Sequence, residues 1–279
     1  MKKYRCYIVA LVLLLLFVIP CSGWVQDSVK EELKLILDGI QDLVERRNVN
    51  ESTPLIIAIG GCPGVGKSTI SQILQTELSH LGIVSVILSL DHYGLGQNER
   101  KQFASELDPR RIQWNKLHNT LKDICKGNTE IIKPTINQLT KEMSQETLQL
   151  ANVSCILFEG AYTLGDFAPM NFLQYADLSI YLESSLENIY NWKWQRELKK
   201  PIPRHSEAFF CHMMEILKDF AFHVYPTRKN ADHIIHIDFF HRYSITNNDA
   251  IKNTPLPNFT TLRLETLSYH TQTKEGSSK

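Results

Sequence analysis

The sequence has few cysteines and no excess of charge of either sign, and both features exclude classes of protein. Its six cysteines among 279 residues are scattered, without a C-x-x-C pair or a zinc-ligand spacing. They therefore predict neither a disulfide framework nor a metal framework. The 30 basic and 30 acidic residues cancel, so the composition indicates no nucleic-acid surface and no acidic tail. An apolar content of 43% is that of an ordinary globular chain, and no internal repeat is visible.

The sequence also has no long apolar run, and its longest apolar stretch, near the N-terminus, is short for a membrane span. A basic stretch at residues 2–5 precedes an apolar run at residues 7–20, and small residues follow. Residues 1–23 thus have the layout of a secretory signal peptide, while a short uncleaved anchor fits the same pattern. We expect membrane contact only through residues 6–22. This leader predicts export or membrane association.

Residues 24–53 are expected to form an amphipathic helix followed by a polar linker. Ser28 and Glu31 have the spacing of a capping box at a helix start. Apolar residues then recur at helical spacing through residues 28–47. This stripe can pack on the domain that follows, or it can contact a membrane or a partner.

The clearest motif is Gly61-Cys62-Pro63-Gly64-Val65-Gly66-Lys67-Ser68, which fits G-x-x-x-x-G-K-[ST] at each specified position. A buried-strand pattern at residues 55–59 precedes it, and a helical pattern follows as far as Gly82. In a phosphate loop, Lys67 would reach the β- and γ-phosphates and the Ser68 hydroxyl would ligate Mg²⁺. The alternative is a glycine-rich turn that binds nothing. The expected nucleotide-binding residues are Gly61, Cys62, Pro63, Gly64, Val65, Gly66, Lys67, Ser68 and Thr69.

Short apolar runs alternate with helical patterns through the rest of the domain. Four of these runs predict further strands, at residues 83–90, 153–158, 177–182 and 232–237. The alternation predicts an α/β fold of the P-loop NTPase type, in three layers with a central parallel sheet. We expect a domain at 54–246, with a substrate-covering insertion at 95–151, a lid at 186–205 and a polar tail at 247–279.

Two carboxylates stand where predicted strands end. Asp91 follows the second strand and Glu159 ends the third. Ligands gather at the carboxyl ends of parallel strands, so both face the γ-phosphate if both strands adjoin the loop strand. Asp91 could then accept a proton from an attacking hydroxyl, and Glu159 could hold Mg²⁺ or its water. The alternative for Asp91 is a turn residue that only ends its strand.

Basic residues recur along and after the predicted helix at 186–199. They are Lys193, Arg196, Lys199, Lys200 and Arg204. Phosphoryl transfer benefits from mobile cations that close over the developing charge, and we select Arg196 for that role. The alternative is a helix face that is simply solvated.

With these motifs in this order, the chain resembles the uridine kinase and phosphoribulokinase family of P-loop small-molecule kinases over about residues 55–237. The resemblance rests on the phosphate loop and on Asp91-His92-Tyr93, Leu157-Phe158-Glu159-Gly160, Lys193-x-x-Arg196-Glu197 and Asn230-Ala231-Asp232-His233-Ile234-Ile235. It implies that the chain uses ATP and Mg²⁺. It also implies that Asp91 is the catalytic base, which acts with Lys67 and Arg196. Lysine and glutamate replace an arginine and an aspartate of the family's lid helix.

The segment that contacts the nucleoside in uridine kinases departs from the family pattern. Those enzymes carry P-x-Y-D followed by a histidine, whereas this chain has Pro134-Thr135-Ile136-Asn137 and no histidine before Glu159. The departure argues against uridine and leaves phosphoryl transfer intact. The candidate substrate contacts are Asp108, Arg110, Arg111 and Lys133.

Three functions remain open. The first is a kinase that phosphorylates a hydroxyl of a small nucleoside- or sugar-like metabolite, without nucleic acid and with homo-oligomers allowed. The second is a nucleotide-binding module without turnover. The third is a GTP-binding switch, since Asp91-x-x-Gly94 fits D-x-x-G, but His118 occupies the position in Asn115-Lys116-Leu117-His118 where a carboxylate would read guanine. ATP use favours a compartment that contains ATP, whereas the leader favours export.

Overall fold

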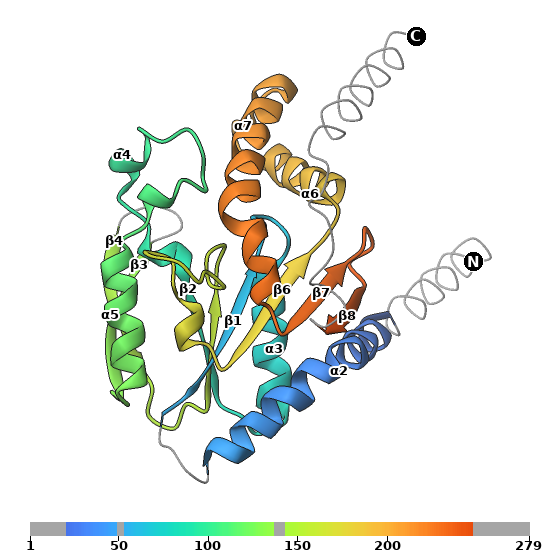
Figure 1. Cartoon of the computed structure of the whole chain (residues 1–279). Coiled ribbons are helices and arrows are strands. Elements are labelled where there is room, and N and C mark those ends of the chain that lie inside the picture. The colour runs from blue at the N-terminus through green and yellow to red at the C-terminus, as the bar shows by residue number, and fades with distance from the viewer. Residues whose placement is uncertain (1–20, 49–52, 137–142, 248–279) are drawn as a thin grey trace, which may run out of the picture.

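A six-stranded sheet forms the centre of the computed structural model, which describes residues 21–48, 53–136 and 143–247 (Figure 1). The strand order is β2-β5-β1-β6-β7-β8. The strands are β1 (Leu55–Gly61), β2 (Ser85–Ser89), β5 (Cys155–Glu159), β6 (Leu178–Glu183), β7 (His233–Ile237) and β8 (Tyr243–Asn247).

Five of these strands are parallel, and β8 pairs antiparallel with β7. All seven residues of β1 are buried, as expected for a central parallel strand covered on both faces. The α/β class with a central sheet is confirmed, but β8 was not predicted. The strand that precedes Asp91 also pairs with β5 and not with β1, so only Glu159 ends a strand that adjoins the loop strand.

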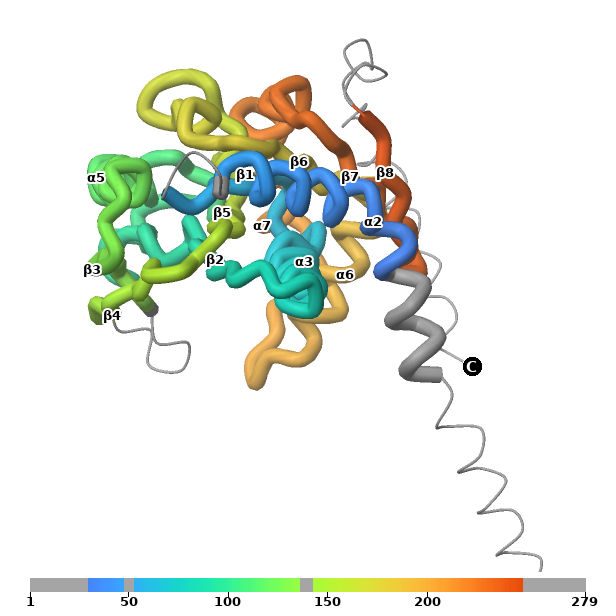
Figure 2. Tube along the Cα trace, turned by 90° about the horizontal axis from the view of Figure 1, so that it is seen from below, coloured from blue at the N-terminus to red at the C-terminus, as the bar shows by residue number. Residues whose placement is uncertain are grey.

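Helices cover both faces of the sheet. In Figure 2, α3 (Lys67–His80) lies on one side of the strands and the segment Phe220–Asn230 lies on the other. Helix α2 (Cys21–Asn48) packs against β8 and α3. It begins seven residues before Ser28, so the expected capping box at Ser28 does not start the helix. None of residues 21–27 is a proline, so no residue there prevents the helical hydrogen bonds from continuing.

The region between β2 and β5 forms a separate lobe. It contains α4 (Gln97–Arg100), α5 (Trp114–Cys125) and a hairpin of β3 (Glu130–Ile136) with β4 (Met143–Gln149). Beyond β6 come α6 (Leu186–Leu198) and α7 (Ser206–Asp219). Figure 1 shows this lobe and the α6–α7 pair on either side of the end of β1.

Within the three described ranges, no helix combines the length and the apolar character that crossing a bilayer requires. The predicted leader lies outside the described residues, except for residues 21–23, which belong to α2. The predicted tail lies outside them as well, apart from residue 247. Targeting by the leader stays a prediction from sequence.

Candidate active site

The phosphate loop joins the end of β1 to the start of α3, as the motif predicts. Gly61 has φ +138°, and a Cβ there would lie 2.5 Å from the carbonyl oxygen of Leu182, so no other residue fits without displacing β6. Gly66 caps α3 in the left-handed region, with φ +105°. The Lys67 Nζ donates hydrogen bonds to the carbonyl oxygens of Gly61 (3.1 Å) and Cys62 (3.0 Å). The lysine is therefore folded back over its own loop.

The Lys67 ammonium lies in the field of two carboxylates. Burial lowers the pKa of Lys67, and the negative charges of Glu159 and Asp91 oppose that shift. These are the two strand-end acids that the sequence singled out. The three groups are therefore close enough to interact electrostatically at the carboxyl end of the sheet.

Glu159 and Ser68 form an oxygen pair beside this lysine. The Ser68 Oγ lies 3.4 Å from Glu159 Oε2, and Glu159 is only 4% exposed. Burial raises the pKa of Glu159, while the charge of Lys67 lowers it. Mg²⁺ prefers oxygen ligands and takes few from the protein, so this pair fits it. Among the described residues, no cluster of three or more histidine, cysteine or acidic side chains offers a complete metal cage.

A cavity of about 490 Å³ opens over the loop and contains most of the predicted site residues. Asp91, Lys67, Ser68, Glu159 and Arg196 all line it. Asp91 is exposed, and its backbone N–H bonds the Ser89 hydroxyl at the end of β2. The other residues of the wall are Pro63, Gly64, Gly66, Thr69, His92, Gly94, Arg100, Glu106, Leu107, Arg111, Ile112, Ala161 and Lys193.

The predicted basic cluster divides into two groups. Lys193 and Arg196 line the cavity, whereas Lys200 and Arg204 form ion pairs with Glu197 at 2.5 and 2.9 Å. Lys199 is exposed at the end of α6 and does not line the cavity. The helix face is therefore partly a cavity wall and partly a solvated ion-pair surface.

Glu106 is a functional candidate that the sequence did not reveal. Its carboxylate accepts hydrogen bonds from Lys193 Nζ (3.2 Å) and His212 Nε2 (3.1 Å). Burial would raise the pKa of Glu106, but the hydrogen bond from His212 and the charge of Lys193 hold it well below its usual range. The Lys193 stem in turn lies over Gly64: the Lys193 Cγ is 2.7 Å from the position that a Cβ on Gly64 would take. Nothing in the local pattern around Glu106 signals this contact with α6 and α7.

Some predicted residues lie away from the cavity wall. Gly61, Cys62 and Val65 form the buried underside of the loop, and burial raises the pKa of Cys62 to about 12. The near match to a guanine-reading motif is on α5, where His118 stacks on Phe172 with ring centroids 4.6 Å apart. None of the four residues of that near match lines the cavity over the loop.

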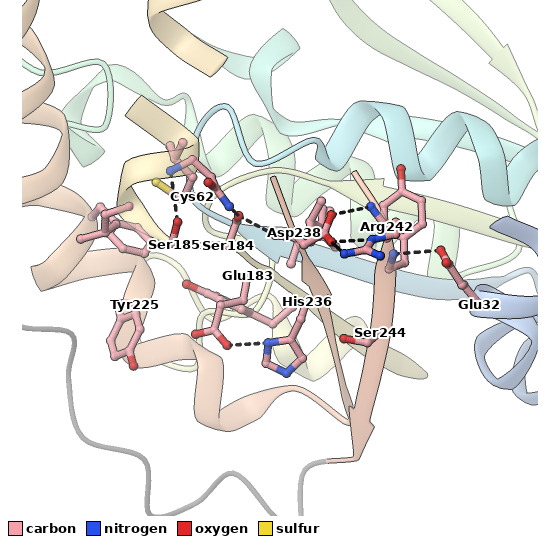
Figure 3. A pocket seen from close by; sticks show the side chains of 18 residues that line it. Glu32, Cys62, Glu183, Ser184, Ser185, Tyr225, His236, Asp238, Arg242 and Ser244 are labelled. Atoms are coloured by element: carbon pink, nitrogen blue, oxygen red, sulfur yellow. Dashed lines mark hydrogen bonds and ion pairs between the residues drawn. The ribbon is translucent and has the colours of Figure 1, made fainter. Parts of the chain in front are cut away.

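A second cavity, of about 780 Å³, begins beneath the loop at Cys62 and runs along the ends of β6, β7 and β8 (Figure 3). Four of its charged side chains form two ion pairs, and Glu32 accepts a hydrogen bond from the Tyr243 backbone N–H. Figure 3 shows Glu183 facing His236 and Asp238 facing Arg242, at 3.2 and 2.6 Å. Apolar side chains, including Leu186, form part of its wall.

The fold and the loop define a P-loop nucleotide-binding protein. Residues 56–238 match the phosphoribulokinase / uridine kinase family, and the chain belongs to that family. The chain is 25% identical over 226 residues to uridine kinase of Saccharomyces cerevisiae, covering 75% of this chain and 44% of that protein. It is 27% identical over 184 residues to pantothenate kinase of Haemophilus influenzae, covering 62% and 59%.

The solved structure of phosphoribulokinase from Rhodobacter spheroides superposes with a TM-score of 0.59 at 12% identity. That match covers 73% of this chain and 83% of the other, and it supports the fold alone. The chain spans about half the length of the curated relatives it matches, at 44% and 59% of the two named above.

Proposed function

We propose that the protein is a kinase that transfers the γ-phosphoryl group of ATP to a hydroxyl of a small metabolite. The observation that carries this proposal is one cavity in which Asp91, Lys67 and the Ser68–Glu159 pair converge on the phosphate loop. Membership of a family that contains kinases supports the same reaction. A binding module that had lost its chemistry would not need an acid facing the loop from β2.

Each side chain has a role in this scheme. The loop N–H groups and Lys67 bind the β- and γ-phosphates, and Arg196 stabilises the charge that develops on the transferring group. The acceptor oxygen forms a bond to the γ-phosphorus as the bond to the ADP oxygen breaks, and Asp91 takes the acceptor's proton. Ser68 and Glu159 would hold Mg²⁺, which when bound neutralises phosphate charge.

We assign the nucleoside end of ATP to the second cavity. That cavity starts at Cys62 in the phosphate loop and has Ile237 in its wall. The Ile237 Cδ1 lies 3.8 Å from the position that a Cβ on Gly66 would take, so a wall residue of one cavity contacts a wall residue of the other at the start of α3. A nucleotide with its phosphates on the loop can extend into this space.

The test is a phosphorylation screen of the full chain with Mg-ATP and with Mg-GTP, in which nucleosides, pantothenate, glycerate and sugar phosphates serve as acceptors. We expect ATP-dependent product with at least one acceptor, and Lys67→Ala should abolish most of it while leaving the fold intact. A chain that binds Mg-ATP but phosphorylates nothing would favour the binding module. A preference for GTP without any acceptor would favour the switch.

A further inference from the structure

We propose that the acceptor carries an anionic group, a carboxylate or a phosphate, which Arg100 and Arg111 bind beside Asp91. This inference rests on the proposed kinase function and specifies its substrate class. Both arginines line the cavity over the phosphate loop, and both come from the lobe between β2 and β5. Neither belongs to the loop or to the α6 helix that faces it.

Backbone pairing places the two arginines on the Asp91 side of the cavity. Residues 93–95 run antiparallel to residues 111–113, with Leu95 N–H bonded to the Arg111 carbonyl (2.7 Å) and Gln113 N–H bonded to the Tyr93 carbonyl (2.8 Å). This pairing brings Arg111 next to the turn that carries Asp91. Arg100, at the end of α4, has its Nη1 3.7 Å from the position that a Cβ on Gly94 would take. Its guanidinium therefore lies against the same turn.

Neither of these two arginines has a carboxylate in direct contact among the described residues. In the part of the chain that the structure describes, neither guanidinium forms an ion pair, and the Arg111 guanidinium donates one hydrogen bond, to the Ser105 carbonyl oxygen (2.6 Å). Burial lowers the pKa of Arg111, and the charge of Arg100 lowers it further, so the two cations repel each other. The charges of Glu106 and Asp108 oppose this effect, but Glu106 already bonds Lys193 and His212, and Asp108 bonds Arg110.

Two neighbouring cations of this lobe, by contrast, form direct ion pairs with carboxylates. Arg110 is paired with Asp108 at 2.6 Å and is largely exposed. Lys133 is 3% exposed, forms an ion pair with Glu146, and lies 3.3 Å from His92 behind the cavity wall. Arg100 and Arg111 differ from both because they line the cavity and form no ion pair with any described residue. Planar guanidinium groups in this position are suited to binding a carboxylate or phosphate through two parallel hydrogen bonds.

The phosphates of ATP have other partners. Lys67 lies in the loop, and the Lys193 stem covers Gly64 of the same loop. An acceptor whose hydroxyl approaches Asp91 would bring its remaining groups against Gly94 and the two arginines. A neutral acceptor would leave both half-buried guanidinium groups without a carboxylate or phosphate partner, at a cost in affinity.

The first experiment compares acceptors that differ mainly in the anionic group, with the full chain and Mg-ATP. The pairs are glycerol against glycerate and glycerol 3-phosphate, ribulose against ribulose 5-phosphate, and panthenol against pantothenate. In the pair that contains the best substrate, we expect kcat/KM to be about ten- to a hundredfold higher for the anionic acceptor than for its neutral counterpart. The neutral acceptor cannot form the charge-assisted hydrogen bonds. The carboxylate and phosphate arms distinguish the two sources of charge. Equal or better turnover of the neutral acceptors would overturn the proposal.

The second experiment uses Arg100→Gln and Arg111→Gln, with Lys101→Gln as the matched control. Each cavity variant should raise the KM for the anionic acceptor about tenfold or more and leave the KM for ATP unchanged. The Lys101 variant should behave like the parent chain, because Lys101 is exposed, bonds Asn98 and does not line the cavity. A rise in the KM for ATP alone would assign both arginines to the nucleotide and refute an acceptor site.

A third measurement separates this proposal from the kinase function itself. The chain saturated with Mg²⁺ and a non-hydrolysable ATP analogue is titrated with inorganic phosphate and with glycerate by calorimetry. Binding that disappears in both cavity variants supports the anion site even if no acceptor is phosphorylated, in which case the kinase function alone fails. The anion site is refuted if neither phosphate nor glycerate binds, or if both variants still bind the anion.

Discussion

The Ser68 hydroxyl lies 3.4 Å from a carboxylate oxygen of Glu159, and this contact joins the first turn of α3 to the end of β5. The two residues are 91 positions apart, and the parallel pairing of β1 with β5 brings them together. Glu159 is buried, so its charge has a cost in the folded chain unless a cation compensates it. Lys67 supplies part of that compensation. A bound Mg²⁺ would supply the rest.

Glu159→Gln should separate metal binding from stability. We expect the affinity for Mg-ATP to fall about tenfold or more and to recover partly at high Mg²⁺, because one oxygen ligand loses its charge. The melting temperature of the nucleotide-free chain should stay the same or rise. Burial raises the pKa of Glu159, so ionisation of this group reduces stability as the pH increases through the folded-state value. Unchanged Mg²⁺ dependence with a lower melting temperature would contradict a metal role.

Asp91→Asn should affect turnover and little else. Asparagine keeps the shape of the side chain but cannot accept the acceptor's proton, and general-base assistance is typically worth about 10²–10⁴-fold. We expect kcat to drop by at least about a hundredfold with ATP affinity nearly unchanged. Asp123→Asn, on the exposed face of α5, is the control. If nucleotide affinity falls together with the rate and recovers at high Mg²⁺, Asp91 binds the metal. If only the melting temperature falls, it stabilises the turn.

Local sequence was enough to locate the loop and both strand-end acids. Gly61–Ser68 is a contiguous pattern, and Glu159 directly ends an apolar run. The cavity wall that carries Arg100 and Glu106 was not predictable in the same way. Arg100 reaches the site by lying against Gly94, and Glu106 reaches it by contact with Lys193 and His212. Such contacts depend on tertiary packing and leave no periodicity in the sequence.

Strand β8 and the order of the sheet were missed for related reasons. Tyr243–Asn247 is a polar edge strand of five residues with no continuous apolar run, and only its pairing with β7 shows that it belongs to the sheet. Alternating strands and helices indicate a parallel sheet but do not fix which strands are neighbours. Consequently Asp91 faces the loop from β2, with β5 between that strand and β1.

Glu183→Gln should lower stability through the buried cation that it leaves behind. Glu183 accepts two hydrogen bonds from Arg228 at 2.9 Å, and Arg228 is 8% exposed. Breaking one partner of a buried pair costs about 3–5 kcal/mol, and because Glu183 is partly exposed we expect about 2–4 kcal/mol. Asp38→Asn, which breaks an exposed pair with Lys34, should cost at most about 1 kcal/mol. Chemical unfolding of the two variants measures the difference, and equal costs would contradict a buried pair.

The same pair predicts the pH at which this contribution disappears. Burial opposes the charge of Glu183, but hydrogen bonds from His236 and Arg228 hold its pKa at about 2, below the ordinary 4.5. A carboxyl group whose pKa is lower in the folded chain than in the unfolded chain stabilises the fold at pH values above its unfolded-state pKa. This stabilisation is lost as the pH falls from about 4.5 toward 2. The difference in unfolding free energy between parent and Glu183→Gln should therefore shrink over that range.

Glu106→Gln should strengthen the binding of ATP. In the nucleotide-free chain the Lys193 ammonium is 3.2 Å from Glu106, while its stem covers Gly64 of the phosphate loop. Phosphates that arrive at the loop must compete with this carboxylate for the lysine. Glutamine is a weaker competitor because it has no charge, so we expect the Kd for Mg-ATP to fall a few-fold, about 2- to 5-fold for a half-exposed pair.

The stability of this variant should change in the opposite direction. The pKa of Glu106 lies well below its usual range, so the folded chain favours the ionised form and loses that contribution when the charge is removed. A slightly lower melting temperature with tighter ATP binding is the expected result, and Glu215→Gln on the exposed face of α7 should change neither. Weaker ATP binding in Glu106→Gln would instead mean that Glu106 holds Lys193 in the position from which it contacts the phosphates.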